Sequence, residues 1–219
     1  MKLRRLLIDV NTQRDFLYPD GAWTVANRQA VMANLRKLMR VVRARRIPVV
    51  SCMDMHRPCE PSRSVPAHCV DGTTGQEKVP FTLMPRRVFV QADNTFNLPP
   101  NLTSRYRQLI FAKRGTDVLN NPKAERLLSA MKCEMLYVCG VALEHSVRAG
   151  VLGLLTRNKP VTVITDACGY FDNEQADMAL RQMDAKGARL IGTAEFVDLL
   201  LADEARPRRL AEAVTSKSK

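Results

Sequence analysis

The sequence predicts an α/β fold in which a mainly parallel sheet is covered by helices on both faces, and three observations predict it. Short β-rich runs alternate with helical patterns along the chain, and such alternation produces right-handed crossovers between parallel strands. The chain has 219 residues, which fits one domain with a substantial buried core. Its composition, 46% hydrophobic and 26% charged, is that of a globular protein and excludes disorder, collagen and coiled coil.

The first half of the chain begins with a buried strand at residues 6–10. An amphipathic helix follows, because apolar residues recur on one helical face at Val31, Leu35, Leu38, Met39 and Val42. Pro48 ends this helix, and residues 49–53 form a second strand. Residues 54–86 are rich in proline and glycine without a sustained period, and so long a loop in a compact domain is usually functional.

The second half contains four more predicted strands, at residues 109–112, 135–139, 161–165 and 189–191. The helices between them have recognisable starts, and they run from Asn121-Pro122, from about Ser146 to Asn158, from an Asp172/Gln175 capping box through Met183, and from a Thr193 cap to near Ala202. We therefore expect one domain over residues 1–202 and a basic, flexible tail over residues 203–219.

The formal net charge of +12 raises the question of nucleic-acid binding. Much of the charge lies on the outer face of the first helix and in the tail, at Arg36, Lys37, Arg40, Arg43, Arg45, Arg46, Arg206, Arg208, Arg209, Lys217 and Lys219. Basicity alone attracts phosphates without specifying a site. There is no zinc-finger spacing or RNP motif, and only 5% of residues are aromatic, so a nucleic-acid partner is disfavoured.

The expected compartment is the cytoplasm, without a membrane partner. No apolar run approaches the ~20 residues of a membrane-spanning helix, and Asp9 interrupts the apolar start of the chain too early for a signal segment. The six cysteines form no C-x-x-C pair and no dense framework, which favours reduced thiols.

A candidate metal site follows the second strand. Asp54 and His56 come directly after it, and His68 lies twelve residues further along the same loop. A carboxylate with two imidazoles is a common ligand set for Zn²⁺, Fe²⁺ or Mn²⁺, and Glu60 is near enough in sequence to be a fourth ligand. Two unrelated surface histidines are the alternative, and the spacing alone does not decide between them.

Two further strand ends carry candidate catalytic residues. Lys113 ends the strand at 109–112, where a lysine can orient a carbonyl or stabilise an anion, although most such lysines are simply solvated. Ser146 opens a helix after Gly140, where a nucleophile would gain from the helix dipole and free backbone N–H groups. Serine is also an ordinary helix-starting residue.

These elements together resemble the isochorismatase-like cysteine hydrolases, and most closely their nicotinamidase branch. The resemblance covers about residues 5–200 in colinear order, and its most specific stretch is Pro66–Glu77. The other matching stretches are Gln13-Arg14-Asp15-Phe16-Leu17 with Gly21 and Val25, Asp54-Met55-His56, Lys113, Gly140-Val141-Ala142 and Thr165-Asp166-Ala167-Cys168.

The resemblance implies a three-layer αβα sandwich and the chemistry of a thiol amidase. In such enzymes an aspartate base, a lysine and a cysteine nucleophile form an acyl-enzyme that water then hydrolyses. It also implies a cis peptide bond before Ala142, at Val141, that shapes an oxyanion hole. Asp54, His56 and His68 match the family's metal ligands, which hold a pyridine nitrogen, and relatives of this kind usually form homo-oligomers.

This chain departs from the family at two of the three triad positions. Asn11 stands where the family has its aspartate, Ser146 where it has its cysteine, and only Lys113 is retained. A hydroxyl needs a base more than a thiol does, and an amide cannot accept a proton near neutral pH. Strand alternation would place Asp9 on the same side as Asn11 but ~6.6 Å further back, which is a poor distance for proton transfer.

The expected substrate pocket differs as well. Phe16 belongs to the first matching stretch, but Val65 replaces the aromatic ring that the family often has before the Pro-x-His-Cys motif. We therefore expect a protein that binds a small amide or heteroaromatic ligand beside a divalent metal, with little or no thiol-type amidase activity. The alternatives are an active amide hydrolase that uses Ser146 or metal-activated water, and a basic nucleic-acid-associated or scaffold protein.

Overall fold

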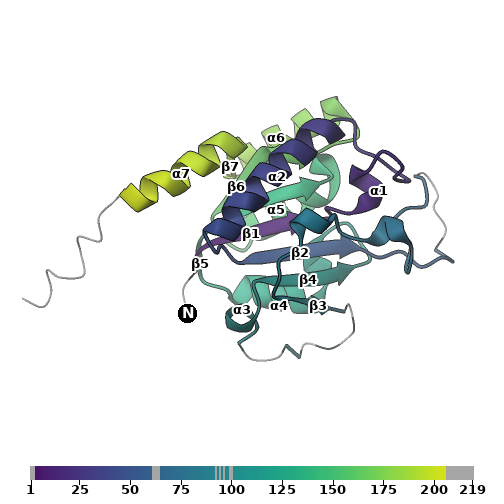
Figure 1. The fold of residues 1–219 in the computed structure, drawn as a ribbon, viewed down its shortest axis with the longest axis horizontal. Helices are drawn as coiled ribbons and strands as arrows, with labels where there is room; N and C mark the ends of the chain where they lie inside the picture. The colour runs from purple at the N-terminus through teal and green to yellow at the C-terminus, as the bar shows by residue number, and fades with distance from the viewer. Residues whose placement is uncertain are drawn as a thin grey trace, which may run out of the picture.

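The computed structural model of the chain describes residues 3–60, 65–91, 93, 95, 97–98 and 101–205, with side chains to residue 202. Its centre is a seven-stranded, all-parallel sheet in the order β3-β4-β2-β1-β5-β6-β7 (Figure 1). The strands are β1 (Leu3–Val10), β2 (Val49–Asp54), β3 (Arg87–Val90), β4 (Gln108–Lys113), β5 (Cys133–Val141), β6 (Val161–Gly169) and β7 (Arg189–Ile191).

Helices cover both faces of the sheet, which confirms the three-layer α/β prediction (Figure 1). One face packs against α2 (Arg28–Ala44), α7 (Thr193–Ala205) and the short α1 (Arg14–Leu17), and the other against α3 (Leu102–Arg105), α4 (Pro122–Ala130), α5 (Arg148–Leu155) and α6 (Asn173–Ala185). Alternation along β1 feeds the two cores, because Leu6, Ile8 and Val10 enter one and Leu7 enters the other. Short turns are η1 (Thr74–Gln76), η2 (Pro80–Thr82), η3 (Val118–Asn120) and η4 (Leu143–Val147), of which η4 is a π-turn.

The helix caps follow the sequence closely. The Asn121 side chain accepts hydrogen bonds from the backbone N–H groups of Lys123 and Ala124, and that of Asp172 accepts one from Gln175. Thr193 is itself the first residue of α7 rather than its cap, and α7 continues to Ala205. The predicted flexible tail from residue 206 onward lies outside the described residues.

Two elements differ from the sequence prediction. Strand β3 begins directly after the predicted loop of residues 54–86 and is not among the predicted strands; it is a four-residue edge strand in which only Val90 is buried. The helix expected from Ser146 is divided into the π-turn η4 and the regular helix α5, which ends at Leu155. No helix in the described part of the chain is long and apolar enough to cross a membrane.

All six cysteines are free thiols, and burial separates them by reactivity. Burial raises the pKa of Cys52 to about 11 and that of Cys168 to about 12, whereas Cys59 is exposed. Since the thiolate is the reactive form, a disulfide reagent at neutral pH is expected to modify Cys59 quickly in the native protein and the buried thiols only on unfolding. Cys59→Ser should remove the fast phase of the reaction and leave only a slower one from the half-buried Cys133, whose pKa is raised by burial. A fast phase that survives this substitution would contradict these positions.

Candidate functional site

Four strand ends bring the candidate catalytic residues together. Strands β4, β2, β1 and β5 are consecutive neighbours in the sheet, so their carboxyl ends lie at one edge. Asp54 and Lys113 are the last residues of β2 and β4 and are paired in register. Asn11 follows β1 directly, and Ser146 lies in the π-turn after β5. The edge therefore collects two charged and two neutral polar groups.

Asp54 is the common partner in this cluster. Asn11 Nδ2 donates to Asp54 Oδ2 at 2.7 Å, and Lys113 Nζ donates to the other carboxylate oxygen, Oδ1. Lys113 is 1% exposed and Asp54 8%, and Lys113 Nζ also donates to the carbonyl oxygen of Gly115 at 2.9 Å. The buried lysine charge is therefore balanced by Asp54, because position 11 carries no charge.

Ser146 Oγ faces two hydrogen-bond donors. Asn11 Nδ2 lies 3.2 Å from it and Lys113 Nζ lies 3.3 Å from it. The orientation of the Asn11 amide is fixed by its other partners, since Asp54 can only accept and the Cys52 thiol donates to Asn11 Oδ1 at 3.4 Å. Among the described residues, no hydrogen bond shows Ser146 donating its proton to a base.

Asp9 makes its contacts away from Ser146, and the prediction that its side chain shares a side with that of Asn11 is wrong. Asp9 Oδ2 pairs with Lys78 Nζ at 2.9 Å on the α2 face of the sheet and also accepts a hydrogen bond from Ser51. The reason is the left-handed backbone of Asn11, with φ of 46°, which breaks the strand alternation and turns the Asn11 side chain toward Cys52 and Asp54.

Cys52 is a thiol that contacts the cluster, but it cannot serve as the nucleophile. Its side chain is 0% exposed, and burial raises its pKa to about 11. The protonated thiol is a weak nucleophile, and no substrate could reach it. Cys52 is therefore not an alternative to Ser146 as the candidate nucleophile.

Gln13 positions Asp54 through the backbone. Its amide accepts a hydrogen bond from Asp54 N at 2.8 Å and donates one to Asp54 O at 2.9 Å. The same side-chain nitrogen donates to Gln76 O at 2.8 Å, so Gln13 also ties the end of β2 to η1. Gln13 is fully buried, and its side chain fixes the residue that both Asn11 and Lys113 contact.

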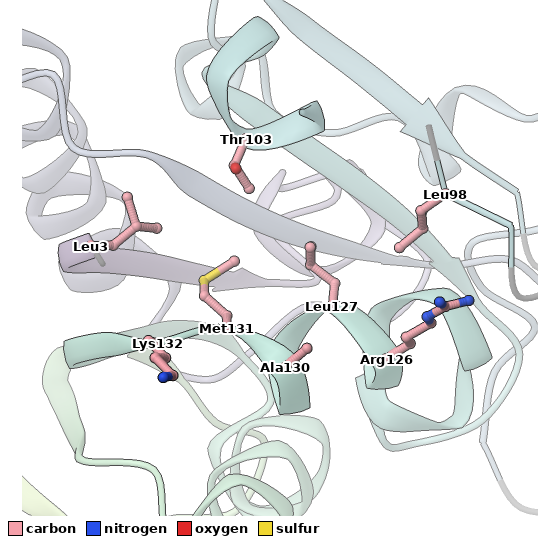
Figure 2. Close-up of a pocket in the computed structure, with 8 residues that line it drawn as sticks. All are labelled: Leu3, Leu98, Thr103, Arg126, Leu127, Ala130, Met131 and Lys132. Carbon is pink, nitrogen blue, oxygen red and sulfur yellow. The ribbon is translucent and has the colours of Figure 1, made fainter. Parts of the chain in front are cut away.

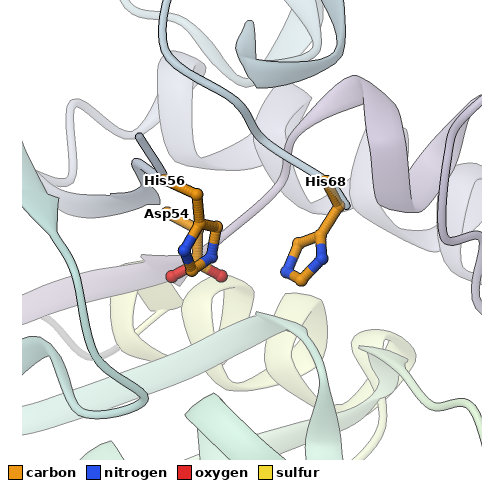
Figure 3. Close-up of side chains that lie close together, drawn as sticks. All are labelled: Asp54, His56 and His68. Carbon is orange, nitrogen blue, oxygen red and sulfur yellow. The ribbon is translucent and has the colours of Figure 1, made fainter. Parts of the chain in front are cut away.

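The candidate metal ligands also meet at this edge. Ligand atoms of Asp54, His56 and His68 all lie within 4.8 Å of one another, and the two imidazole rings approach Asp54 from separate parts of the loop (Figure 3). His68 Nδ1 donates to Pro66 O at 2.7 Å, which leaves its Nε2 atom free for a metal. Burial lowers the pKa of His68, which keeps the ring in the neutral form that metals bind.

Glu60 is not part of this group of ligand atoms. Its Oε2 atom lies 3.2 Å from His56 Nδ1, and its Oε1 atom pairs with Arg114. Glu60 therefore orients His56 and leaves the Nε2 atom of that ring available, which is the usual arrangement for a carboxylate behind a ligating histidine.

The position of His68 depends on Asp15. Asp15 Oδ2 accepts a hydrogen bond from Cys69 N at 2.6 Å, directly after His68, and Oδ1 accepts one from Ala22 N at 3.0 Å. Gly75 packs directly on this carboxylate, because a Cβ atom there would lie 2.1 Å from Oδ1. Asp15 therefore connects the residue after His68 to the segment around Ala22, and this connection fixes the position of His68.

Asp15→Ala is expected to weaken metal binding roughly 10- to 100-fold, because His68 loses its fixed position. Titration of Zn²⁺ against a chromophoric chelator measures the change. Asp20→Ala removes an exposed carboxylate from the same segment and is the matched control. Equal affinities for the two variants would show that Asp15 does not position the ligand.

Aromatic side chains border the histidines. The ring centroid of Phe16 lies 5.3 Å from that of His68, whereas Val65 is 36% exposed and offers no ring. Trp23, which the sequence analysis did not single out, lies 4.7 Å from His68 and stacks on Phe171 at 3.9 Å. The signal that could have identified Trp23 is that it is the single tryptophan of the chain and lies inside the first motif region.

The backbone after β5 has the expected geometry. The peptide bond between Val141 and Ala142 is cis, and both residues are buried beside the π-turn that carries Ser146. Gly140 has φ of 121°, and a Cβ atom there would lie 1.9 Å from Val10 O, so only glycine permits this close approach of β5 to β1.

Glu144 is another residue that the sequence analysis did not single out. Its side chain accepts hydrogen bonds from the N–H groups of Phe171 and Asp172.

The protein is a parallel α/β domain, and its candidate catalytic and metal-binding side chains lie together at the carboxyl ends of the strands. The chain belongs to the isochorismatase family, because the sequence model of the Isochorismatase domain matches residues 5–195. The resemblance deduced from the motifs is thereby confirmed at the level of the family.

Solved structures share this fold. The pyrazinamidase of Pyrococcus horikoshii in complex with zinc is 24% identical, with a TM-score of 0.69 over 86% of this chain and 99% of that chain. An isochorismatase-like hydrolase from Alkaliphilus metalliredigens is 17% identical, with a TM-score of 0.72 over 90% and 99%. PnC1 from L. infantum in complex with nicotinate is 18% identical, with a TM-score of 0.65 over 89% and 96%. No curated protein sequence matches the chain significantly.

Proposed function

We propose that the chain binds a small amide or heteroaromatic ligand beside a divalent metal and has little or no thiol-type amidase activity. One observation carries the proposal: Asn11 presents its amide N–H to Ser146 Oγ, where a base would have to accept a proton. Both groups that contact the hydroxyl oxygen are donors, so its lone pairs are occupied while its proton has no acceptor among the described residues.

Asp54, His56 and His68 are the residues that would hold the metal. One carboxylate and two imidazoles suit Zn²⁺, Fe²⁺ or Mn²⁺, and three protein ligands leave a position for a small molecule. The zinc complex of the Pyrococcus horikoshii pyrazinamidase supports this choice. When bound, such an ion supplies a Lewis acid that attracts a ring nitrogen or a carbonyl oxygen.

The aromatic border favours a flat ligand. Phe16 and Trp23 lie beside His68, and the related PnC1 was solved with nicotinate, a heteroaromatic acid. In this proposal Lys113 contributes a positive charge close to the ligand, and Asn11 and Ser146 contribute hydrogen bonds rather than proton transfer.

Metal analysis with ligand-induced thermal shifts tests the proposal. The purified chain is expected to bind Zn²⁺ stoichiometrically, and nicotinamide or nicotinate should raise its melting temperature only when metal is present. His56→Ala with His68→Ala should abolish both effects, whereas His145→Ala, the remaining histidine, should retain the metal. A metal-free protein that is indifferent to both compounds would refute the proposal.

An active amide hydrolase is the second candidate, and Lys113 favours it because its Nζ atom, 3.3 Å from Ser146 Oγ, would stabilise negative charge that develops there. Hydrolysis of amides that disappears in Ser146→Ala, or on addition of a chelator, would support this candidate over the first.

A nucleic-acid-associated role requires binding with a steep salt dependence that is lost when residues 203–219 are removed. The cytoplasmic location and the homo-oligomeric state stay predictions, and gel filtration with light scattering tests the latter.

A further inference from the structure

A cavity lined by arginines lies on the opposite edge of the sheet from the polar cluster. Its volume is about 240 Å³, and four of its six lining residues are Arg43, Arg46, Arg86 and Arg107. Arg86 and Arg107 directly precede β3 and β4, and Arg46 lies three residues before β2. These strands are parallel neighbours, so their amino ends share one edge, and the topology alone concentrates the arginines there.

The backbone holds these arginines in place. Arg107 N donates to Arg86 O at 2.7 Å, and Val49 N donates to Arg107 O at 2.9 Å. Arg46 has a left-handed backbone, with φ of 54°, at the end of α2, and its N–H donates to Arg43 O. The Arg43 guanidinium donates to the carbonyl oxygens of Phe81 and Leu83, which ties α2 to the loop that floors the cavity.

The positive charge of this cavity is not neutralised by any residue that lines it. The two other lining residues are Met84 and Pro85, so none of the six is acidic. Burial and the neighbouring charges of Arg46 and Arg86 lower the pKa of Arg107. Within the described part of the chain, the side chains of Arg46, Arg86 and Arg107 form no ion pair. Like charges held this close are stabilised by an anion that bridges them.

A contrasting cavity shows that basicity is not general at this edge. A hollow of about 550 Å³ near the start of β1 is lined largely by apolar residues, with Leu3, Leu98, Leu127 and Met131 among them and the cationic Arg126 and Lys132 beside them (Figure 2). The arginine cavity has less than half that volume and twice as many cationic residues. Its size and its donors therefore suit a compact, multiply charged oxyanion.

We infer that the arginine cavity binds a small molecule through a phosphate or diphosphate group. Guanidinium groups bind phosphate oxygens through paired N–H donors, and those of Arg46, Arg86 and Arg107 have no other partner within the described residues. No aromatic ring lines the cavity, so there is no surface on which the bases of a single-stranded nucleic acid could stack. This site is independent of the proposed function, because it lies at the other end of the strands.

Calorimetric titration with inorganic diphosphate tests the inference. The natural chain is expected to bind diphosphate, and Arg86→Gln with Arg107→Gln should weaken that binding roughly tenfold or more. Arg181→Gln with Lys186→Gln removes the same charge from exposed positions on and after α6 and should change little. Arg46→Gln, at an exposed position, is expected to weaken binding as well and does not depend on the folding of the double variant.

Titration with a second ligand, a nucleoside diphosphate, distinguishes recognition of the phosphate groups alone from recognition of a nucleotide. A nucleoside diphosphate that binds as well as inorganic diphosphate shows that the phosphates alone are recognised, and tighter binding shows that the nucleoside also contributes. Binding of diphosphate that is unchanged in the arginine variants would overturn the inference. So would a chain that binds an oligonucleotide but not diphosphate, which would indicate a nucleic-acid surface instead.

Discussion

Asn11→Asp combined with Ser146→Cys is expected to raise kcat/KM for nicotinamide hydrolysis by at least about 100-fold over the natural chain. The double variant supplies a carboxylate that can accept a proton and a thiol that is easily ionised. The geometry is favourable, because the Asn11 side chain already reaches within 3.2 Å of Ser146 Oγ and Lys113 Nζ within 3.3 Å. The assay uses metal-loaded protein near neutral pH.

The single variants distinguish the two defects. Ser146→Cys alone should gain little, because the amide at position 11 still cannot accept a proton, and Asn11→Asp alone should gain little because a hydroxyl is a poor acid. Adding Lys113→Met to the double variant should remove most of the gain. If Ser146→Cys alone matches the double variant, Asn11 is not what limits the chemistry.

The activity profile of the double variant should also depend on pH. A carboxylate at position 11 would lie close to Asp54, since Asn11 Nδ2 is now 2.7 Å from Asp54 Oδ2. Two carboxylates at this distance raise the pKa of one of them, so the activity should fall as that carboxyl becomes protonated on the acid side. Asp54 is therefore both a candidate metal ligand and the neighbour that would raise the pKa of a carboxyl group at position 11.

Lys78→Met is expected to lower the free energy of unfolding by about 3–5 kcal/mol, because it leaves a buried carboxylate without its cation. The side chains of Lys78 and Asp9 are each 1% exposed, and their charged atoms lie 2.9 Å apart. Lys78 Nζ also donates to Thr12 Oγ1 at 2.7 Å, so the substitution breaks a buried network. Urea unfolding followed by circular dichroism measures the loss.

A second variant separates the charge from the packing. Asp9→Asn with Lys78→Met removes both charges and should recover a large part of the lost stability, since a neutral amide is less costly to bury than a lone carboxylate. Lys186→Met, at an exposed position, should change the stability little. An equal loss in the single and double variants would mean that packing, rather than the unpaired charge, determines the stability here.

The sequence allowed the layers and the edge of the sheet that bears the site to be predicted. Strand and helix periods gave the α/β class, and candidate residues at strand ends had to meet because parallel strands end at one edge. Strand β3 was not predicted, because its apolar run, Val88-Phe89-Val90, is short and directly follows the long irregular loop. The other edge strand, β7, was predicted at its observed residues, 189–191.

The details of the site could not be read from spacing. The prediction that Asp9 and Asn11 face the same side of the sheet was wrong, because the left-handed backbone at Asn11 interrupts the regular alternation of side chains along the strand. The sequence does not reveal this φ angle. Gln13 and Asp15 act through contacts with Asp54 and Cys69, which are 41 and 54 residues away in the chain. Trp23 reaches His68 from a different segment, and such long-range packing has no local period.

The left-handed backbone at position 11 narrows the choice of residues there. Asparagine and aspartate adopt this conformation far more readily than branched or bulky residues, so either of them can occupy the end of β1 without backbone strain. An exchange between acid and amide at this position therefore changes the proton chemistry of the site without requiring a different backbone.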